Sequence, residues 1–139
     1  MSAASNYLEN KVLDHVLTAT SYSAPATRYL ALFKNTSGNA ATNLEAGTLT
    51  DEVSTSGTAY ARQAVTFAAA STGTSATNAT VTFPAATDNW GTITHIAVMD
   101  GDTEGAGNVL FWGAVTTPKT IETGDTFQVS TGNLTVSLA

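Results

Sequence analysis

The sequence contains no cysteine, and this absence excludes several kinds of site at once. Without cysteine there is no disulfide, no thiolate nucleophile and no cysteine-ligated zinc. Charged side chains are also scarce, at 12% of 139 residues, which is about half the share in an average globular protein. A surface with so few charges is either solvated by hydroxyl groups or partly hidden in an assembly. We favour the assembly.

Positive charge is the scarcest of all, and this bears on the partners. Five basic residues oppose eleven acidic ones, which gives a net charge of −6. Phosphate backbones are bound by clustered lysine and arginine, so we expect no nucleic-acid partner. No apolar run approaches the ~18 residues that a membrane span needs, so we expect no membrane partner either. The basic residues are scattered along the chain, at Lys11, Arg28, Lys34, Arg62 and Lys119.

Motifs that carry chemistry are missing too. Two histidines and many serines form no recognisable nucleophilic set, and no glycine pattern of a phosphate-binding loop is present. Acidic pairs occur at 51–52 and at 100 and 102, but both lie in polar turns, where nothing would raise a carboxyl pKa for acid catalysis. We therefore predict no catalytic residue, no cofactor, no metal site and no enzymatic activity.

The most informative stretch that is present is 90–115. Two apolar segments, 93–99 and 109–115, flank a polar run at 100–108, as in a β-hairpin with a long tip. The arms are apolar nearly throughout, which is typical of strands buried on both faces. The tip resembles a calcium loop only superficially, because the twelfth position of an EF-hand loop must be Glu and here is Phe111. A solvated turn and opportunistic cation binding both remain open.

Three further side chains of this stretch invite a functional interpretation. Trp90 and Trp112 are interpreted as packing residues rather than sugar platforms, and His95 as a packed or hydrogen-bonded strand residue. A competing hypothesis, a secreted binding module or hydrolase, requires a concave polar pocket around His95, Asp100 or Trp112.

One helix is predicted, over residues 6–18. Apolar side chains recur there at helical spacing, with Asn6 as N-cap and Glu9 three residues later. A helix of about three turns is not stable alone in water, so it must dock on this chain or on a neighbouring subunit. Its apolar residues are the candidate subunit contacts: Leu8, Val12, Leu13, Val16 and Leu17.

The remainder predicts a mainly β fold. The whole chain, 1–139, is expected to form one domain, a single antiparallel β-sandwich (jelly-roll-like or immunoglobulin-like) with that one N-terminal α-helix. Segment 35–58 is predicted to be a long polar loop, either solvated or in contact with a partner, and 116–121 a connection containing Pro118. Beyond the hairpin, strands are predicted at 28–34, 59–68, 79–83, 126–130 and 133–138.

Arg62 is the one charged residue in the strand predicted at 59–68. Its neighbours are largely apolar, so its charge needs an acidic partner. We predict a structural ion pair that anchors a loop.

Several ordered blocks of the sequence resemble a family of tailed-bacteriophage virion proteins often labelled "phage tail fiber protein". They are SAASNYLENKVLDHVL at 2–17, YLALF at 29–33, YARQAVTF at 60–67, FPAAT at 83–87 and the Trp90-Gly91 pair. The resemblance covers almost the whole chain and implies a virion structural protein. It brings no catalytic motif.

The expected function follows from the resemblance and the size. A chain of 139 residues lacks the long repetitive shaft of a true fibre, so a capsid decoration (cement) protein is the first expectation. The alternative is a tail or head fibre component that contacts a host receptor or another tail protein. The expected partners are the major capsid protein, or tail proteins in the alternative, together with copies of the chain itself in a homo-oligomer, preferably a trimer. The expected location is the virion, assembled in the host cytoplasm.

Overall fold

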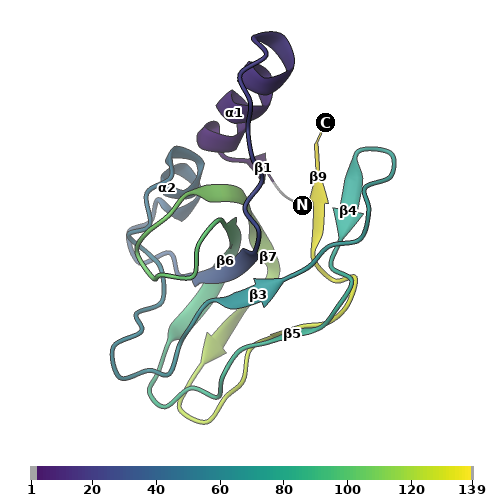
Figure 1. Cartoon of the computed structure of the whole chain (residues 1–139). Helices are drawn as coiled ribbons and strands as arrows, with labels where there is room; N and C mark the ends of the chain where they lie inside the picture. Colours follow the sequence, from purple (N-terminus) through teal and green to yellow (C-terminus); the bar gives the residue numbers. More distant parts are fainter. Residues whose placement is uncertain (1–2, 139) are drawn as a thin grey trace.

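Residues 3–138 are described by a computed structural model, and strands dominate them (Figure 1). In chain order the elements are β1 (Ala3–Ala4), α1 (Asn6–Leu17), β2 (Arg28–Phe33), α2 (Ala40–Ala46), β3 (Gln63–Val65), β4 (Thr74–Ala76), β5 (Val81–Thr82), β6 (Gly91–Met99), β7 (Val109–Ile121), β8 (Gln128–Val129) and β9 (Thr135–Ser137).

The described strands form one large sheet and two small ones. The large sheet has the order β1-β7-β6-β2-β3, while β4 pairs with β9 and β5 with β8. Every pairing is antiparallel. The mainly β, antiparallel class predicted from the sequence is confirmed.

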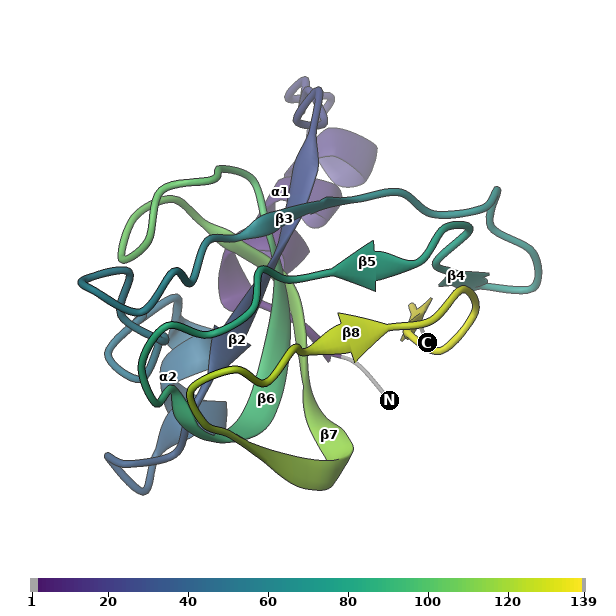
Figure 2. The ribbon, with the colours of Figure 1, turned by 90° about the horizontal axis from the view of Figure 1, so that it is seen from below.

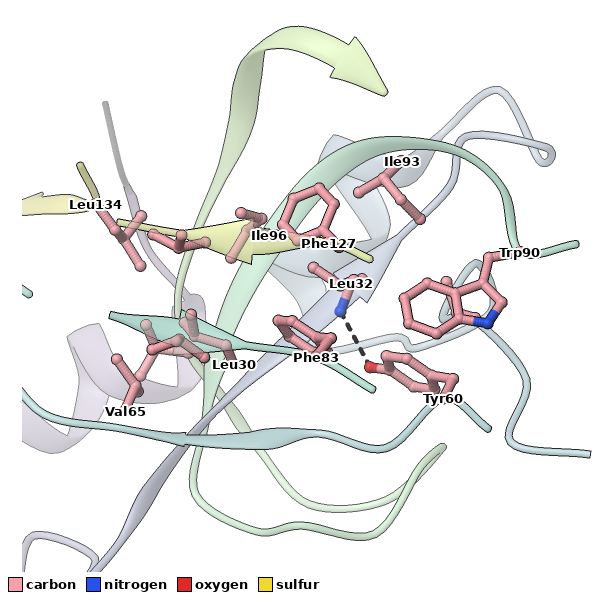
Figure 3. Close-up of a cluster of buried hydrophobic side chains, with 14 of the residues drawn as sticks. Leu30, Leu32, Tyr60, Val65, Phe83, Trp90, Ile93, Ile96, Phe127 and Leu134 are labelled. Carbon is pink, nitrogen blue, oxygen red and sulfur yellow. Dashed lines mark hydrogen bonds between the residues drawn. The ribbon is translucent and has the colours of Figure 1, made fainter. Parts of the chain in front are cut away.

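The main core lies between the large sheet and the small ones. Figure 2 shows β5 and β8 running together in front of β6 and β7, which gives the sandwich-like layering. Side chains from both layers meet there, among them Leu30, Leu32 and Ile96 from the large sheet and Phe83 and Phe127 from the opposite side (Figure 3). Trp90 closes one end of this core at 1% exposure, and its indole N–H donates to the Thr58 carbonyl at 2.8 Å. Trp90 is thus a packing residue, as predicted.

The other face of the large sheet carries a second, smaller core. Alternate residues of β2 and β6, Ala31, Phe33, Ala97 and Met99, pack there against Leu44 of α2. Both faces of β2 and β6 are therefore covered, one by strands and one by a helix. This explains why their sequences are apolar at consecutive positions rather than at alternate ones.

Strands β6 and β7 form the predicted hairpin, and they are the two longest of the described strands. Strand β7 continues to Ile121, so the prediction of a separate connection at 116–121 is wrong. The register changes between the pairs Ile93–Lys119 and His95–Ala114, which leaves extra residues of β7, Pro118 among them, in an irregular segment. Proline is tolerated in a strand at such a bulge, because the ladder needs no N–H there.

Helix prediction is correct at the N-terminus and incomplete afterwards. The described residues contain two helices, because α2 lies inside the segment 35–58 that was predicted to be a loop. Ala40 and Leu44, one turn apart, are its buried residues, and Gly47 ends it with a positive φ of 80°. The expected N-cap of α1 also shifts by one residue. Ser5, held in extended conformation after β1, accepts the Leu8 amide, and Asn6 is the first helical residue.

Short strands account for the remaining differences. The predicted strand at 59–68 pairs regularly only over β3, while β1 and β4 were not predicted. Two or three residues are too few to show a period, and both missed strands exist because they pair with partners far along the chain, β7 and β9.

Candidate functional site

The polar tip of the hairpin, residues 100–108, is closed by its own side chains. Asp100 lies at its start and Asn108 at its end, and the Asp100 carboxylate accepts the Asn108 backbone N–H at 2.7 Å and its side-chain amide at 2.8 Å. Gly107 between them has a φ of +83°, and an added Cβ would lie 2.8 Å from the Asp100 carboxylate. Glycine is needed there for both reasons.

A buried ion pair between Arg62 and Glu52 makes hydrogen bonds to the backbone of this tip. The Arg62 guanidinium binds the Glu52 carboxylate with two parallel hydrogen bonds, Nε to Oε1 at 2.7 Å and Nη2 to Oε2 at 2.8 Å. The remaining Arg62 Nη1 donates to the carbonyls of Gly101 and Ala106, at 2.8 and 3.0 Å. The Gly105 amide in turn donates to Glu52 Oε2 at 2.9 Å. The pair thus joins the tip to both β3 and the segment after α2.

Burial defines the electrostatics of this pair. The two side chains are 0% and 1% exposed. Burial alone would lower the pKa of Arg62, but the hydrogen bonds and the charge of Glu52 raise it above its ordinary value, so the guanidinium stays charged. Tyr60 donates its hydroxyl to Glu52 Oε1 at 3.0 Å and accepts the Leu32 amide at 3.0 Å. Burial, followed by the charge of Glu52, raises the pKa of Tyr60, which keeps the phenol protonated as a donor.

Arg62 is predicted to form a structural ion pair that anchors a loop, and the structure shows both the pair and the loop. The loop that it anchors is the tip, and its acidic partner is Glu52, which no sequence pattern distinguishes from the other acids. Glu52 lies in the polar segment 35–58, directly after Asp51. No hydrophobic periodicity in that segment predicts that Glu52 is buried. The usable signal is the following residue, Val53, which is the one apolar side chain among residues 50–58.

A second polar group lies on the α2 side of the sheet. Asp51, 3% exposed, accepts hydrogen bonds from the Thr36 hydroxyl and from the Ser37 amide and hydroxyl. Burial opposes its charge, but these hydrogen bonds lower its pKa below the ordinary value. His95 lies on the same face, with Nδ1 at 2.8 Å from the Thr94 hydroxyl, and burial lowers its pKa in spite of the charge of Asp51.

The three residues named by the binding-module hypothesis make hydrogen bonds within the chain. Trp112, which packs against the smaller core, donates its indole N–H to Glu45 of α2 at 2.7 Å. His95, Asp100 and Trp112, named by the binding-module hypothesis, thus each make local structural contacts. Among the described residues, no three His, Cys, Asp or Glu side chains are grouped to hold a metal ion. None of the described helices is long and apolar enough to cross a membrane.

The candidate contact residues of α1 divide into two sets. Leu8 is 6% exposed and belongs to the main core, and Val12 packs against that core. Leu8 thus lies on the side of the helix that packs against its own chain, and its contact in this structure is the main core. The other three lie outside the core, with exposures of 54% for Leu13, 70% for Val16 and 73% for Leu17. We call these three residues the α1 stripe.

An apolar groove opens elsewhere on the surface, with a cavity volume of about 420 Å³. It lies between the adjoining ends of β6 and β7 and the β4–β9 pair. We call it the β9 groove. Arg28, at the start of β2, is the one charged residue of its described lining. Its apolar lining includes Phe67, Val98, Leu110, Phe111, Val136 and Leu138.

The described surface thus carries three features: the acidic tip held by Arg62, the exposed α1 stripe and the apolar β9 groove. The comparison with protein families gives the assignment. The family described as "Podophage GP4 fiber I protein gp80" matches residues 3–137, and the chain belongs to this family. The resemblance to phage tail fibre-type virion proteins is thereby confirmed. No curated protein matches the chain.

Proposed function

We propose that this protein is a non-enzymatic fibre component of a bacteriophage virion. The observation that carries the proposal is the family match, which extends over nearly all of the described chain and names a fibre protein. The family therefore favours the fibre alternative over the capsid decoration role that the short chain suggested. The structural use of Arg62, Glu52, Asp100 and Asp51 supports a scaffold rather than a catalyst, because these polar groups are occupied by internal hydrogen bonds.

The proposed partners are other virion proteins and further copies of the chain. In the fibre role the partners are tail proteins or a host receptor, and in the decoration role the major capsid protein. The low charge content and the exposed α1 stripe support self-association, because a large apolar side chain exposed at a helix end is stabilised by covering it. The trimer remains the preferred state of the proposal.

The location of the protein on the particle tests the fibre role. Cryo-electron microscopy of the virion, with copy number from quantitative mass spectrometry, is expected to place a small number of copies at the tail or at one vertex. Density at every local symmetry position of the shell, with correspondingly many copies, would instead establish the decoration role.

The tip is the proposed outward contact surface. Asp102 is exposed, and the loop that carries it is held in one shape by Arg62 and Glu52, so a partner can bind it at little cost in conformational entropy. Virions carrying Asp102→Asn together with Glu104→Gln are expected to adsorb to the host more slowly or to lose the protein from the particle. The matched control is Asp88→Asn, an exposed acid in a different loop. Unchanged adsorption and unchanged occupancy would remove the tip from the contact surface.

A further inference from the structure

The α1 stripe is a continuous surface rather than three isolated side chains. Val16 and Leu17 follow Leu13 by three and four residues, so the three side chains are neighbours on one face of the helix. Leu8 and Val12 hold a different face against the core. The C-terminal turn of α1 projects at one end of the molecule, away from the sheets (Figure 1). The stripe therefore has no cover within the described chain.

The β9 groove can accept such a stripe. A dry apolar cavity of about 150 Å³ is enough for a benzene ring, so a volume of about 420 Å³ can take several aliphatic side chains. The groove is open to solvent at the end of β9: Leu138, which follows β9 and belongs to the lining, is 55% exposed, whereas Leu134, which precedes β9, is 6% exposed.

Charge indicates which occupant fits. The groove carries the positive charge of Arg28, and the stripe is bordered by two exposed acids, Glu9 one turn before Leu13 and Asp14 beside it. Within residues 3–138 the ion pair is that of Arg62 with Glu52, so Arg28, Glu9 and Asp14 have no ionic partner in that part of the chain. An apolar helix face with acidic borders is the complement of an apolar groove with a basic edge.

The stripe does not reach the groove of its own chain. The start of α1 is fixed to β7, because the Ser5 amide donates to the Leu110 carbonyl at 3.0 Å and the Ser5 hydroxyl donates to that of Val109. Leu110 is itself part of the groove lining, so the helix starts beside the groove, but none of the three stripe residues is among the described lining, and all three are exposed. Stripe and groove can both be filled at once only between different molecules.

We propose that the α1 stripe of one copy docks in the β9 groove of the next, with Asp14 or Glu9 facing Arg28. Stripe and groove are different surfaces, so the contact is head-to-tail. A head-to-tail contact gives a ring when the rotation between copies closes and an open filament when it does not, and the proposal is a ring of three copies. This inference rests on the proposed role of an assembling virion subunit, and specifies the surface through which copies meet.

Disulfide trapping tests the contact directly, because the chain has no cysteine of its own. The doubly substituted Leu17→Cys/Leu138→Cys chain is expected, on oxidation, to form covalent dimers and a closed trimer. Each single variant alone is expected to remain monomeric on a denaturing gel, and a mixture of the two single variants to give covalent dimer. Self-cross-linking of Leu17→Cys alone would indicate a helix-to-helix contact and overturn the proposal, as would a double variant that gives no covalent product.

Charge reversal tests the same contact without cysteine. Asp14→Arg and Arg28→Asp are each expected to weaken self-association of the full chain roughly tenfold in sedimentation velocity, and the combination to restore it. The control is Thr117→Asp, an exposed position at the far end of β7. An oligomer that is unaffected by both Asp14→Arg and Arg28→Asp would overturn the docking but leave the fibre role intact. A wild-type chain that stays monomeric at every concentration would also overturn the docking. Virion microscopy decides the fibre role independently of either result.

Discussion

The hairpin tip and the end of α1 are both exposed, yet they are built in opposite ways. The tip is polar and consists of turns, but buried groups hold it: Arg62 Nη1 bonds two of its carbonyls and Glu52 accepts one of its amides. The end of α1 is regular and apolar, and Val16 and Leu17 at its last turn are more than two-thirds exposed.

The difference shows that one exposed region is stabilised within its own chain, whereas the other leaves apolar side chains uncovered. The tip needs no partner to keep its shape, because a buried ion pair supplies the hydrogen bonds that a loop otherwise takes from water. The end of α1 keeps its helical shape through backbone hydrogen bonds, but its side chains gain free energy only when another surface covers them. Changes at the buried residues that hold the tip should therefore affect folding, whereas changes at the α1 stripe should affect association.

Breaking the support of the tip is expected to have the largest effect. Arg62→Met leaves the Glu52 carboxylate buried and unpaired, which should lower the free energy of unfolding by about 3–5 kcal/mol. Urea denaturation measures this loss, and hydrogen exchange should show that the Gly105 amide exchanges faster. The double variant Arg62→Met/Glu52→Leu should recover part of the loss, because no unpaired charge remains. A loss under 1 kcal/mol for the single variant would show that the pair does not support the tip.

The two faces of α1 should respond very differently to the same truncation. Leu8→Ala removes a buried side chain and should cost about 2–5 kcal/mol of unfolding free energy. Leu17→Ala, measured at a concentration where the chain is monomeric, should stay within about 0.5 kcal/mol of the wild type. Thermal denaturation of both variants makes the comparison. Equal losses would contradict the division of the helix into a covered and an uncovered face.

Within the tip, the bracing by Asp100 should matter less than the ion pair. Asp100→Ala removes the acceptor of two hydrogen bonds from Asn108 and should cost about 1.5–3 kcal/mol at most, since the site is partly buried and water can replace the carboxylate. Because Arg62 still holds Gly101 and Ala106, the loop should keep its shape in hydrogen-exchange protection. Complete loss of that protection would show that Asp100, and not the ion pair, maintains the tip.

The smallest effect is expected from pH, through the polar group on the α2 side. Burial lowers the pKa of His95, so below about pH 6.5 the unfolded chain binds a proton that the folded chain does not. The free energy of unfolding should therefore decrease as the pH falls from 7 towards 5.5. His95→Gln should flatten that part of the profile, measured by urea denaturation across the pH series. At lower pH the lowered pKa of Asp51 adds a further decrease, because its stabilising charge is lost as it protonates. An unchanged slope in the His95 variant would contradict the assignment.

The parts of the fold that could be predicted are those with a periodic signal. The helix α1 and the strands β2, β6 and β7 carry long apolar patterns. The short helix α2 does not, and Gly47 at its end is not enough to predict it, because a lone glycine is equally typical of a loop. The short strands β1 and β4 carry no pattern of their own, because their pairing with β7 and β9 creates them. Pro118 favours the end of a strand, but β7 continues past it because the irregular segment needs no N–H at that position.

The candidate site was predictable in a similarly partial way. Arg62 stood out because a charge among apolar neighbours needs a partner, which is a local argument. Its partner Glu52 and the loop it holds, 100–108, lie ten and about forty residues away, and nothing in the sequence connects them. The same holds for the β9 groove, whose lining comes from segments spread over most of the chain.

Composition and hydrophobic periodicity were sufficient to predict the antiparallel β class, the central hairpin, the N-terminal helix and the lack of any cysteine chemistry, because both are local properties of the chain. The folded chain was needed to show that a buried ion pair supports the hairpin tip, that Leu8 is buried while Leu17 is exposed, and that an open groove lies beside β9. Each of these depends on which distant segments meet. That is a property of the packed chain and not of any stretch of it.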